Sequence, residues 1–222
     1  LSNSEAAALP LTSITAWELL FDRLQIEKSQ NNKPASVLVI GAAGGVGSIL
    51  VQLAKQLTNL TVVGTAAREE SANWLKDLGV DHVLDHSKNL NEQRLAADLN
   101  EFDYVVSLTH TDQHLDSIIE VIKPQGKLAL IDDPASFDIL KLKRKSISLH
   151  WEFMYTRSMF QTDDMIVQHQ LLSELATLVD NGTIKTTLGE HLGKINVANL
   201  IKAHGILESH KARGKLVLEG FE

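Results

Sequence analysis

The stretch VLVIGAAGGVGSILVQLAK, residues 37–55, decides the fold of this chain. It opens with the apolar run VLVI, which is typical of a central parallel strand that is covered on both faces. Four glycines then mark a tight turn, and residues 46–57 carry apolar side chains at helical spacing. The stretch therefore predicts a strand, a tight turn and a helix in direct succession.

The same alternation of strand and helix continues along the chain. Strands are predicted at residues 60–65, 81–84, 102–108 and 127–131, and helices at residues 69–78, 90–99 and 112–122. Short connections between these elements imply right-handed βαβ units and a parallel sheet. The segment SISLHWEF, from Ser146 to Phe153, is a candidate sixth strand. The expected fold class is therefore α/β, with a doubly wound parallel six-stranded sheet and helices on both faces.

Helical patterns also flank this core on both sides. Residues 9–24, LPLTSITAWELLFDRL, show apolar side chains at helical spacing after a polar start. Beyond the sixth strand we expect a long helix at residues 161–180, another at 197–209 and a last strand at 215–218. A chain of 222 residues can bury one substantial core, so we expect a single domain.

Composition narrows the class of protein. Hydrophobic residues make up 44% of the chain and charged residues 22%, with a net charge of -7, which is typical of a globular protein. The acidic balance argues against nucleic acid or an anionic membrane as a partner. No apolar run approaches the ~20 residues of a membrane span. The absence of cysteine excludes thiolate metal sites within the chain and fits a cytoplasmic protein. Because the chain begins at Leu1, we expect it to be a piece of something longer.

The glycine turn meets the needs of a dinucleotide site. Such a site needs small residues at the bend, at the approach of the backbone to the diphosphate, and where the helix packs on the strand. Ala42, Gly44 and Gly47 supply these three places. The first helical N–H groups, near Gly45 and Val46, would face the diphosphate with the helix dipole behind them. A merely structural turn is the alternative, but a place on the first strand of a βαβ series favours a Rossmann-type dinucleotide fold.

The end of the second predicted strand indicates which dinucleotide binds. NAD sites place Asp or Glu there to hold the ribose 2′-hydroxyl. This chain has GTAAR instead, so that Arg68 could make a charge-assisted contact with a 2′-phosphate. NADP(H) is therefore the expected cofactor. The alternative is that Arg68 is a solvated residue at the start of the next helix.

Four segments resemble one known superfamily. They are LPLTSITAWELLFDRL, LGVDHVLDH, PQGKLALIDDP and HWEFMYTRSMFQTDDM, and together with the glycine turn they resemble the medium-chain dehydrogenases and reductases. Within that superfamily the chain is most similar to the zinc-type alcohol dehydrogenase-like proteins, near the NADPH-dependent quinone oxidoreductases. The resemblance implies that residues 1–222 form the NAD(P)-binding Rossmann domain, with a linker helix at 9–24 and a returning segment at 181–222. It also implies that the N-terminal GroES-like catalytic domain is absent from this chain.

The resemblance implies a set of cofactor contacts and no catalytic residue. Ala42, Gly44, Gly45 and Val46 would hold the diphosphate, Thr65 and Arg68 the 2′-phosphate, His86 the adenosine, and Ser107, Thr109 and Ile131 the ribose and nicotinamide. Catalytic groups would belong largely to the missing domain. Leu11 stands where zinc alcohol dehydrogenases have a cysteine ligand, and leucine cannot bind zinc, so no zinc is expected there.

Other polar and aromatic groups have simpler explanations. His82 and His86 lie four residues apart, as do His110 and His114, but neither pair falls on a predicted helix face, and surface histidines are the favoured interpretation. Asp132 and Asp133 are expected to bind or cap rather than to catalyse, and the basic run 141–145 to be a solvated turn.

The aromatic side chains near residues 151–160 are expected either in the core or at an interface. Members of the superfamily often pair the edge strand that Ser146 to Phe153 would form, so the resemblance implies a homodimer through this strand.

These observations predict an NADP(H)-dependent oxidoreductase that transfers hydride between NADPH and a carbonyl, a quinone or an activated alkene. The substrate is a small molecule, and neither nucleic acid nor a membrane is an expected partner. Two alternatives stay open: a non-enzymatic NADPH-binding sensor and a zinc-dependent alcohol dehydrogenase.

Overall fold

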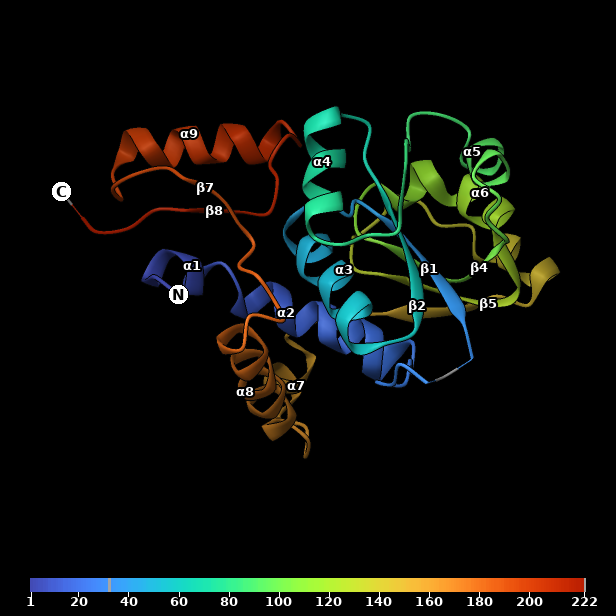
Figure 1. Ribbon diagram of the computed structural model, residues 1–222, viewed down its shortest axis with the longest axis horizontal. Helices are drawn as coiled ribbons and strands as arrows, with labels where there is room; N and C mark the ends of the chain where they lie inside the picture. The colour runs from blue at the N-terminus through green and yellow to red at the C-terminus, as the bar shows by residue number, and fades with distance from the viewer. Residues whose placement is uncertain (32, 222) are drawn as a thin grey trace.

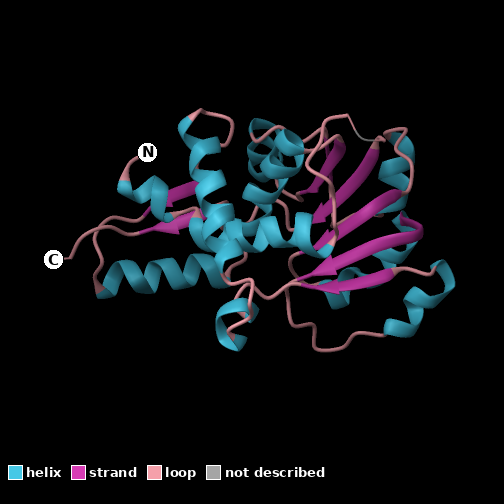
Figure 2. Ribbon diagram, turned by 90° about the horizontal axis from the view of Figure 1, so that it is seen from below, coloured by secondary structure: helices cyan, strands magenta, loops and turns pink. Residues whose placement is uncertain are grey.

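A parallel sheet of six strands forms the centre of the molecule (Figures 1 and 2). The computed structural model describes residues 1–31 and 33–221, so Asn32 and Glu222 of the expected domain lie outside the described residues. The strands are β1 (Ala35–Ile40), β2 (Leu60–Thr65), β3 (His82–Leu84), β4 (Phe102–Ser107), β5 (Ile122–Leu130) and β6 (Ser148–Trp151). Their order in the sheet is β3-β2-β1-β4-β5-β6, with all neighbours parallel. The order reverses between β1 and β4, and the predicted Rossmann-type sheet is confirmed.

Helices cover both faces of the sheet, as expected. The helices that follow the first four strands are α3 (Gly45–Leu57), α4 (Glu69–Asp77), α5 (Leu90–Ala96) and α6 (Thr111–Val121). Helices α3 and α4 pack on one face, and α5 and α6 pack on the other. The apolar run of β1 is continuous because both faces of the strand are buried. Val37 and Val39 belong to the hydrophobic core on the face covered by α3 and α4, while Leu38 and Ile40 belong to the core on the face covered by α5 and α6.

The predicted linker helix is present but changes its winding halfway. It runs as the α-helix α2 (Pro10–Trp17) and continues as the π-helix η1 (Glu18–Arg23). The wider turn is closed by the N–H of Leu24, which donates to the carbonyl of Leu19 at 3.0 Å. Glu18 is fully buried at this transition. Single-turn π segments of this kind often accompany functional or strained sites.

Several boundaries differ from the sequence prediction. Strand β5 begins at Ile122 rather than at residue 127, because the chain stays extended through a register irregularity opposite Phe102 and Tyr104. The long helix predicted at 161–180 begins later, as α8 (Ile166–Asp180), and a separate short helix, α7 (Thr156–Phe160), precedes it. Gln161 separates them, with a φ of 49° in the left-handed region.

Short elements escaped the sequence analysis. Helix α1 (Asn3–Ala7) begins with a capping box between Ser2 and Glu5. The basic run forms the 3₁₀-helix η2 (Ile139–Lys145), since the carboxylate of Asp138 accepts from the N–H of Leu140 at 3.1 Å. Most of the run is exposed, as expected, but it forms a short helix rather than a simple turn.

The end of the chain forms an arm beside the main sheet. Strand β7 (Leu188–His191), helix α9 (Val197–Glu208) and strand β8 (Lys215–Val217) make a parallel two-stranded unit, seen apart from the main sheet in Figure 1. Helix α9 exposes Val197 and Ile201. Among the described residues, 1–31 and 33–221, no helix combines the length and apolar character needed to span a bilayer.

Candidate functional site

A cavity of about 390 Å³ opens at the carboxyl ends of β1, β2 and β4, where the strand order reverses. This is the position at which open α/β sheets bind their ligands. The glycine turn forms one wall, the end of β2 another, and the ends of β4 and β5 a third. His210 and Ala212, from the loop before β8, close the cavity from the side of the arm.

The glycine turn holds the first helical turn of α3 open to this cavity. Gly41 has a φ of 76°, which only glycine adopts without strain, and its carbonyl accepts from the N–H of Gly44 at 3.1 Å. The hydroxyl of Thr65 accepts from the N–H of Gly41 at 3.3 Å and ties the turn to β2. Gly44 occupies the N-cap position of α3 and supplies no side-chain acceptor. The first N–H groups of the helix are therefore available to an anion, and the helix dipole favours one there.

Gly44 and Gly47 serve different purposes. A Cβ at Gly47 would lie 2.3 Å from the carbonyl oxygen of Ala42, so this glycine lets α3 lie directly against the turn. A Cβ at Gly44 would lie 3.4 Å from the carbonyl oxygen of Gly41, which is ordinary contact. The protein alone does not require glycine at residue 44. The space fits the expected approach of backbone to a diphosphate, and the turn therefore fits a dinucleotide.

Eight of the ten predicted contact residues line this one cavity. They are Gly44, Gly45, Val46, Thr65, Arg68, His86, Thr109 and Ile131. Ala42 and Ser107 do not line it, because both are fully buried. Ala42 packs beneath Gly47 and Gly64. The hydroxyl of Ser107 shares a hydrogen bond of 2.7 Å with that of Thr111. Both residues lie behind the wall of the cavity, and their contact with the cofactor stays a prediction.

The cavity carries cationic and titratable nitrogen groups and no carboxylate among its described lining residues. Arg68 stands at the N-cap position of α4, and its Nη2 donates to the carbonyl of Lys211 at 3.0 Å. His86 also lines the cavity, and burial is the largest influence that lowers its pKa. The carboxylate of Asp132 lies nearby but accepts from the N–H and the hydroxyl of Thr111, at 2.8 and 2.5 Å. Asp132 is therefore a capping residue, in agreement with its predicted role.

Three further residues that line the cavity were not assigned to the site from the sequence. His110, His210 and Ala212 line it. His110 follows β4 in the left-handed conformation, with a φ of 49°. His210 and Ala212 come from a loop that lies more than a hundred residues along the chain from the glycine turn. No local pattern could have placed them there.

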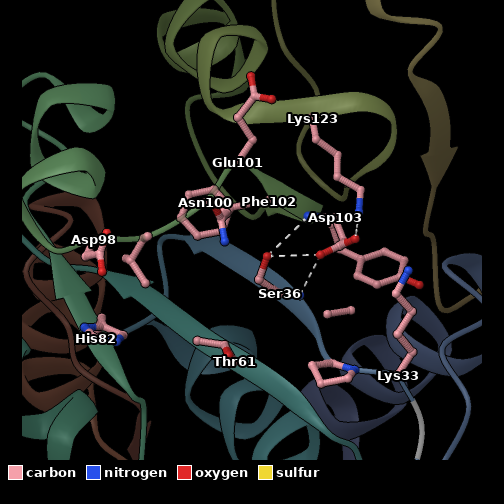
Figure 3. A pocket seen from close by; sticks show the side chains of 14 residues that line it. Lys33, Ser36, Thr61, His82, Asp98, Asn100, Glu101, Phe102, Asp103 and Lys123 are labelled. Atoms are coloured by element: carbon pink, nitrogen blue, oxygen red, sulfur yellow. Dashed lines mark hydrogen bonds and ion pairs between the residues drawn. The ribbon is translucent and has the colours of Figure 1, made fainter.

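A second cavity lies at the opposite edge of the sheet. It measures about 820 Å³ and opens at the amino ends of the strands (Figure 3). Asp103 lines it, accepts from the N–H and hydroxyl of Ser36 at 2.9 and 3.2 Å, and pairs with Lys123. Although this cavity is the larger, it lies away from the carboxyl ends where a dinucleotide binds. The smaller cavity is therefore the candidate site.

The position implied by the resemblance for a zinc ligand does not fit zinc. Leu11, at the position of the cysteine ligand implied by the resemblance, offers no donor atom, and its side chain is exposed. Within residues 1–31 and 33–221, no three His, Asp or Glu side chains are grouped so as to hold a metal ion.

Comparison with known proteins agrees with this site. The family model described as a zinc-binding dehydrogenase matches residues 78–218, more than half of the chain. A zinc-type alcohol dehydrogenase-like protein from Staphylococcus epidermidis is 38% identical over 98% of this chain, which spans 65% of that relative.

Solved structures show the same fold. A putative zinc-dependent alcohol dehydrogenase from Rhizobium etli is 52% identical with a TM-score of 0.94, over 100% of this chain and 65% of its own. A mycobacterial protein solved in complex with NADPH is 25% identical with a TM-score of 0.81, over 98% of this chain and 65% of its own. The chain thus spans 65% of the length of these relatives. It belongs to the zinc-binding dehydrogenase family, and it corresponds to the cofactor domain of the medium-chain dehydrogenases and reductases.

Proposed function

We propose that this chain is the cofactor-binding part of an NADP(H)-dependent oxidoreductase. The observation that carries the proposal is the cavity at the reversal of strand order, which joins an open helix N-terminus to Arg68 without a carboxylate among its described lining residues. An Asp or Glu at the end of β2 would repel a 2′-phosphate, whereas an arginine can donate two parallel hydrogen bonds to it. The mycobacterial relative that was solved with NADPH supports the same choice of cofactor.

Each wall of the cavity then has a role. The N–H groups of Gly45 and Val46 hold the diphosphate, and Arg68 holds the 2′-phosphate. Thr109 and Ile131, at the ends of β4 and β5, line the ribose and nicotinamide end. Bound NADPH supplies the hydride, and the residues of this chain orient it and exclude water.

We further propose a carbonyl, a quinone or an activated alkene as the hydride acceptor. Two observations support this choice. The chain resembles the quinone oxidoreductase branch, and Leu11, at the position of the implied cysteine ligand, has no atom that can bind zinc. The groups that polarise the acceptor belong to the part of the protein outside this chain, and this chain alone is expected to be inactive. Turnover of NADPH with a quinone or enone by a protein that includes that part is the expected result. NADPH binding without turnover across such acceptors would instead favour the sensor alternative.

The choice of cofactor is tested by Arg68→Ala. We expect the affinity for NADPH to fall about tenfold or more, because hydrogen bonds to charged groups contribute roughly 1.5–3 kcal/mol. The affinity for NADH should not change, since NADH lacks the 2′-phosphate. Binding is measured by titration of the dinucleotide fluorescence. Lys76→Ala, which removes an exposed cation at the other end of α4, is the matched control. An unchanged ratio of the two affinities in Arg68→Ala would contradict the assignment of Arg68.

A further inference from the structure

The carbonyl of Ala43, in the middle of the glycine turn, accepts two hydrogen bonds. The hydroxyl of Ser48 donates to it at 3.2 Å, and the N–H of Gly214 donates to it at 2.9 Å. A carbonyl oxygen has two lone pairs, so both acceptor positions of this group are filled. Ser48 is fully buried in α3, and Gly214 directly precedes β8. One atom of the turn is thus held both by the helix that follows it and by the arm.

The side chain of Trp74 determines which way the hydroxyl of Ser48 points. Trp74 lies in α4, on the same face of the sheet as α3 (Figure 1), and its Nε1–H donates to Ser48 Oγ at 2.9 Å. An indole N–H can only donate, so the hydroxyl accepts from Trp74 and directs its own proton to Ala43. A helical serine commonly bonds the carbonyl four residues back, whereas Ser48 reaches one residue further, to the turn itself. Trp74, Ser48 and Ala43 therefore form one hydrogen-bonded chain.

The same indole also encloses the second donor. A Cβ added at Gly214 would lie 3.1 Å from Cζ2 of Trp74 and 2.2 Å from the carbonyl oxygen of Thr187. Gly214 has a φ of 53°, in the left-handed region that favours glycine. Its backbone is therefore held between α4 and the segment that leads into β7, with its N–H directed at Ala43.

The Ala43 carbonyl is directed away from the dinucleotide cavity. Ala43 and Gly44 line this cavity, but Trp74, Ser48 and Gly214 are not among its described lining residues. The N–H at the other end of the same peptide, that of Gly44, donates to the carbonyl of Gly41 at 3.1 Å. Both polar groups of the Ala43–Gly44 peptide are therefore bonded within the protein. The groups that the turn leaves to an anion are the first N–H groups of α3.

This arrangement matters because the peptide precedes a glycine. Gly44 has no Cβ to restrict its φ, so rotation of the Ala43–Gly44 peptide is not hindered by a side chain at that residue. Rotation would turn the carbonyl oxygen toward the cavity, where its partial negative charge would oppose the anion that the N–H groups attract. The hydrogen bonds from Ser48 and Gly214 hold the peptide in the orientation that favours an anion.

We propose that Ser48 and Trp74 are positioning residues for the cofactor, which keep the Ala43 carbonyl out of the cavity and so leave the turn open to the diphosphate. The proposal rests on the proposed function and extends it from the 2′-phosphate to the diphosphate. Neither side chain lines the cavity, so each acts through Ala43. Because NADPH and NADH share the diphosphate, the effect should be equal for both dinucleotides, in contrast to that of Arg68.

The test measures dissociation constants for NADPH, NADH and adenosine 2′-monophosphate, which lacks the diphosphate. Ser48→Ala should weaken the binding of both dinucleotides by the same factor, about two- to tenfold, which is the range for one hydrogen bond. It should leave the affinity for adenosine 2′-monophosphate unchanged. Trp74→Phe keeps an aromatic ring but removes the N–H, and should give a smaller loss with the same pattern. Arg68→Ala should instead weaken NADPH and adenosine 2′-monophosphate and leave NADH unchanged.

Ser173→Ala is the matched control. Ser173 is exposed in α8, and its hydroxyl donates to the carbonyl of His169 at 2.9 Å. The substitution therefore removes a hydrogen bond from a helical serine to the backbone outside the cavity, and all three affinities should equal those of the wild type. Circular dichroism and thermal melting show whether each variant is folded. If Ser48→Ala does not fold, full affinity for the dinucleotides in Trp74→Phe overturns the proposal.

The outcomes separate this proposal from the proposed function. Unchanged dinucleotide affinities in both variants, a loss confined to NADPH, or an equal loss for all three ligands would overturn the positioning role and leave the cofactor assignment intact. Failure of the wild-type chain to bind either dinucleotide would overturn both.

Discussion

Single residues in the glycine turn carry out different tasks. Gly47 is required by packing, since a Cβ there would meet backbone atoms of Ala42 at 2.3–2.5 Å. Backbone cannot move aside as the end of a flexible side chain can. Gly47→Ala should therefore lower the free energy of unfolding by about 1–3 kcal/mol, the usual range for overpacking. Urea denaturation followed by circular dichroism measures the change.

Gly205 is the matched control for this substitution. It lies in α9, and a Cβ there would meet no atom within 4 Å. Gly205→Ala should raise the free energy of unfolding by about 0.5–1 kcal/mol, because alanine loses less backbone freedom on folding. Equal stability of Gly47→Ala and the wild type would show that α3 can shift away from the turn, against the assignment of Gly47 as a packing glycine.

How far the lining of the candidate cavity could be predicted from the sequence depends on whether local or distant contacts place each residue. Gly44, Gly45 and Arg68 lie within a continuous strand, turn and helix, so local spacing was enough to place them. Ser107 was placed correctly along its strand, but the burial of its side chain depends on contact with Thr111. His210 reaches the cavity only through the path of a distant loop, which no periodicity encodes.

Helix η1 meets the segment after β6 through two buried carboxylates. The side chains of Glu18 and Glu152 are almost completely buried, and each faces an arginine. Arg23 Nε lies 2.6 Å from Glu152, and Arg157 Nη1 lies 2.5 Å from Glu18. One oxygen of each carboxylate has no hydrogen-bond partner among the described residues. Burial, followed by the hydrogen bond and the charge of Glu18, raises the pKa of Glu152 to about 8.

This raised pKa predicts a pH-dependent stability. Between about pH 4.5 and pH 8 the folded protein keeps a proton on the pair that the unfolded chain has released. Folding therefore binds protons in this window, and the free energy of unfolding should fall as the pH rises through it. Glu152→Gln, which stays neutral and can donate a hydrogen bond, should flatten this dependence.

The measurement is a series of urea denaturation curves across that window. Glu174→Gln is the matched control, because Glu174 forms an exposed pair with Lys28 at 2.9 Å and should leave the pH dependence unchanged. A wild-type stability that is constant or increases from about pH 5 to pH 8 would exclude a shared proton on this pair.

Helices and strands could be predicted from the sequence where their buried side chains recur at regular spacing. Strands β1, β2 and β4 and the helices between them follow from apolar runs and helical spacing, because the sheet is buried on both faces. Strand β7 was not predicted, because three of its four residues are exposed and it pairs with β8, a strand that is distant in the sequence. The π turn of η1 likewise depends on tertiary contacts around Glu18 rather than on local preference.

At the scale of the whole molecule, the edge of the sheet formed by β6 is a candidate surface for contact with a second copy. Strand β6 pairs with β5 and ends the six-stranded sheet. Near this edge Trp151 and Phe153 are 52% and 53% exposed, and the ring of Trp151 lies 6.3 Å from that of Phe137. Isolated exposed apolar residues are common, but aromatic side chains beside an unpaired strand favour an interface. We propose that two copies pair their β6 strands about a twofold axis, which would continue the sheet across both chains.

This proposal predicts a dimer in solution, with twice the 24.4 kDa mass of one chain. Trp151→Glu should give the monomer, because the substitution places a charge in the apolar contact and, at a twofold axis, does so twice. Leu95→Glu is the control, since Leu95 is 60% exposed on α5, away from the sheet edge. Size-exclusion chromatography with light scattering measures the masses. A wild-type monomer, or a dimer that persists in Trp151→Glu, would show that β6 is not the interface. A dimer that is lost only in Leu95→Glu would place the interface at α5.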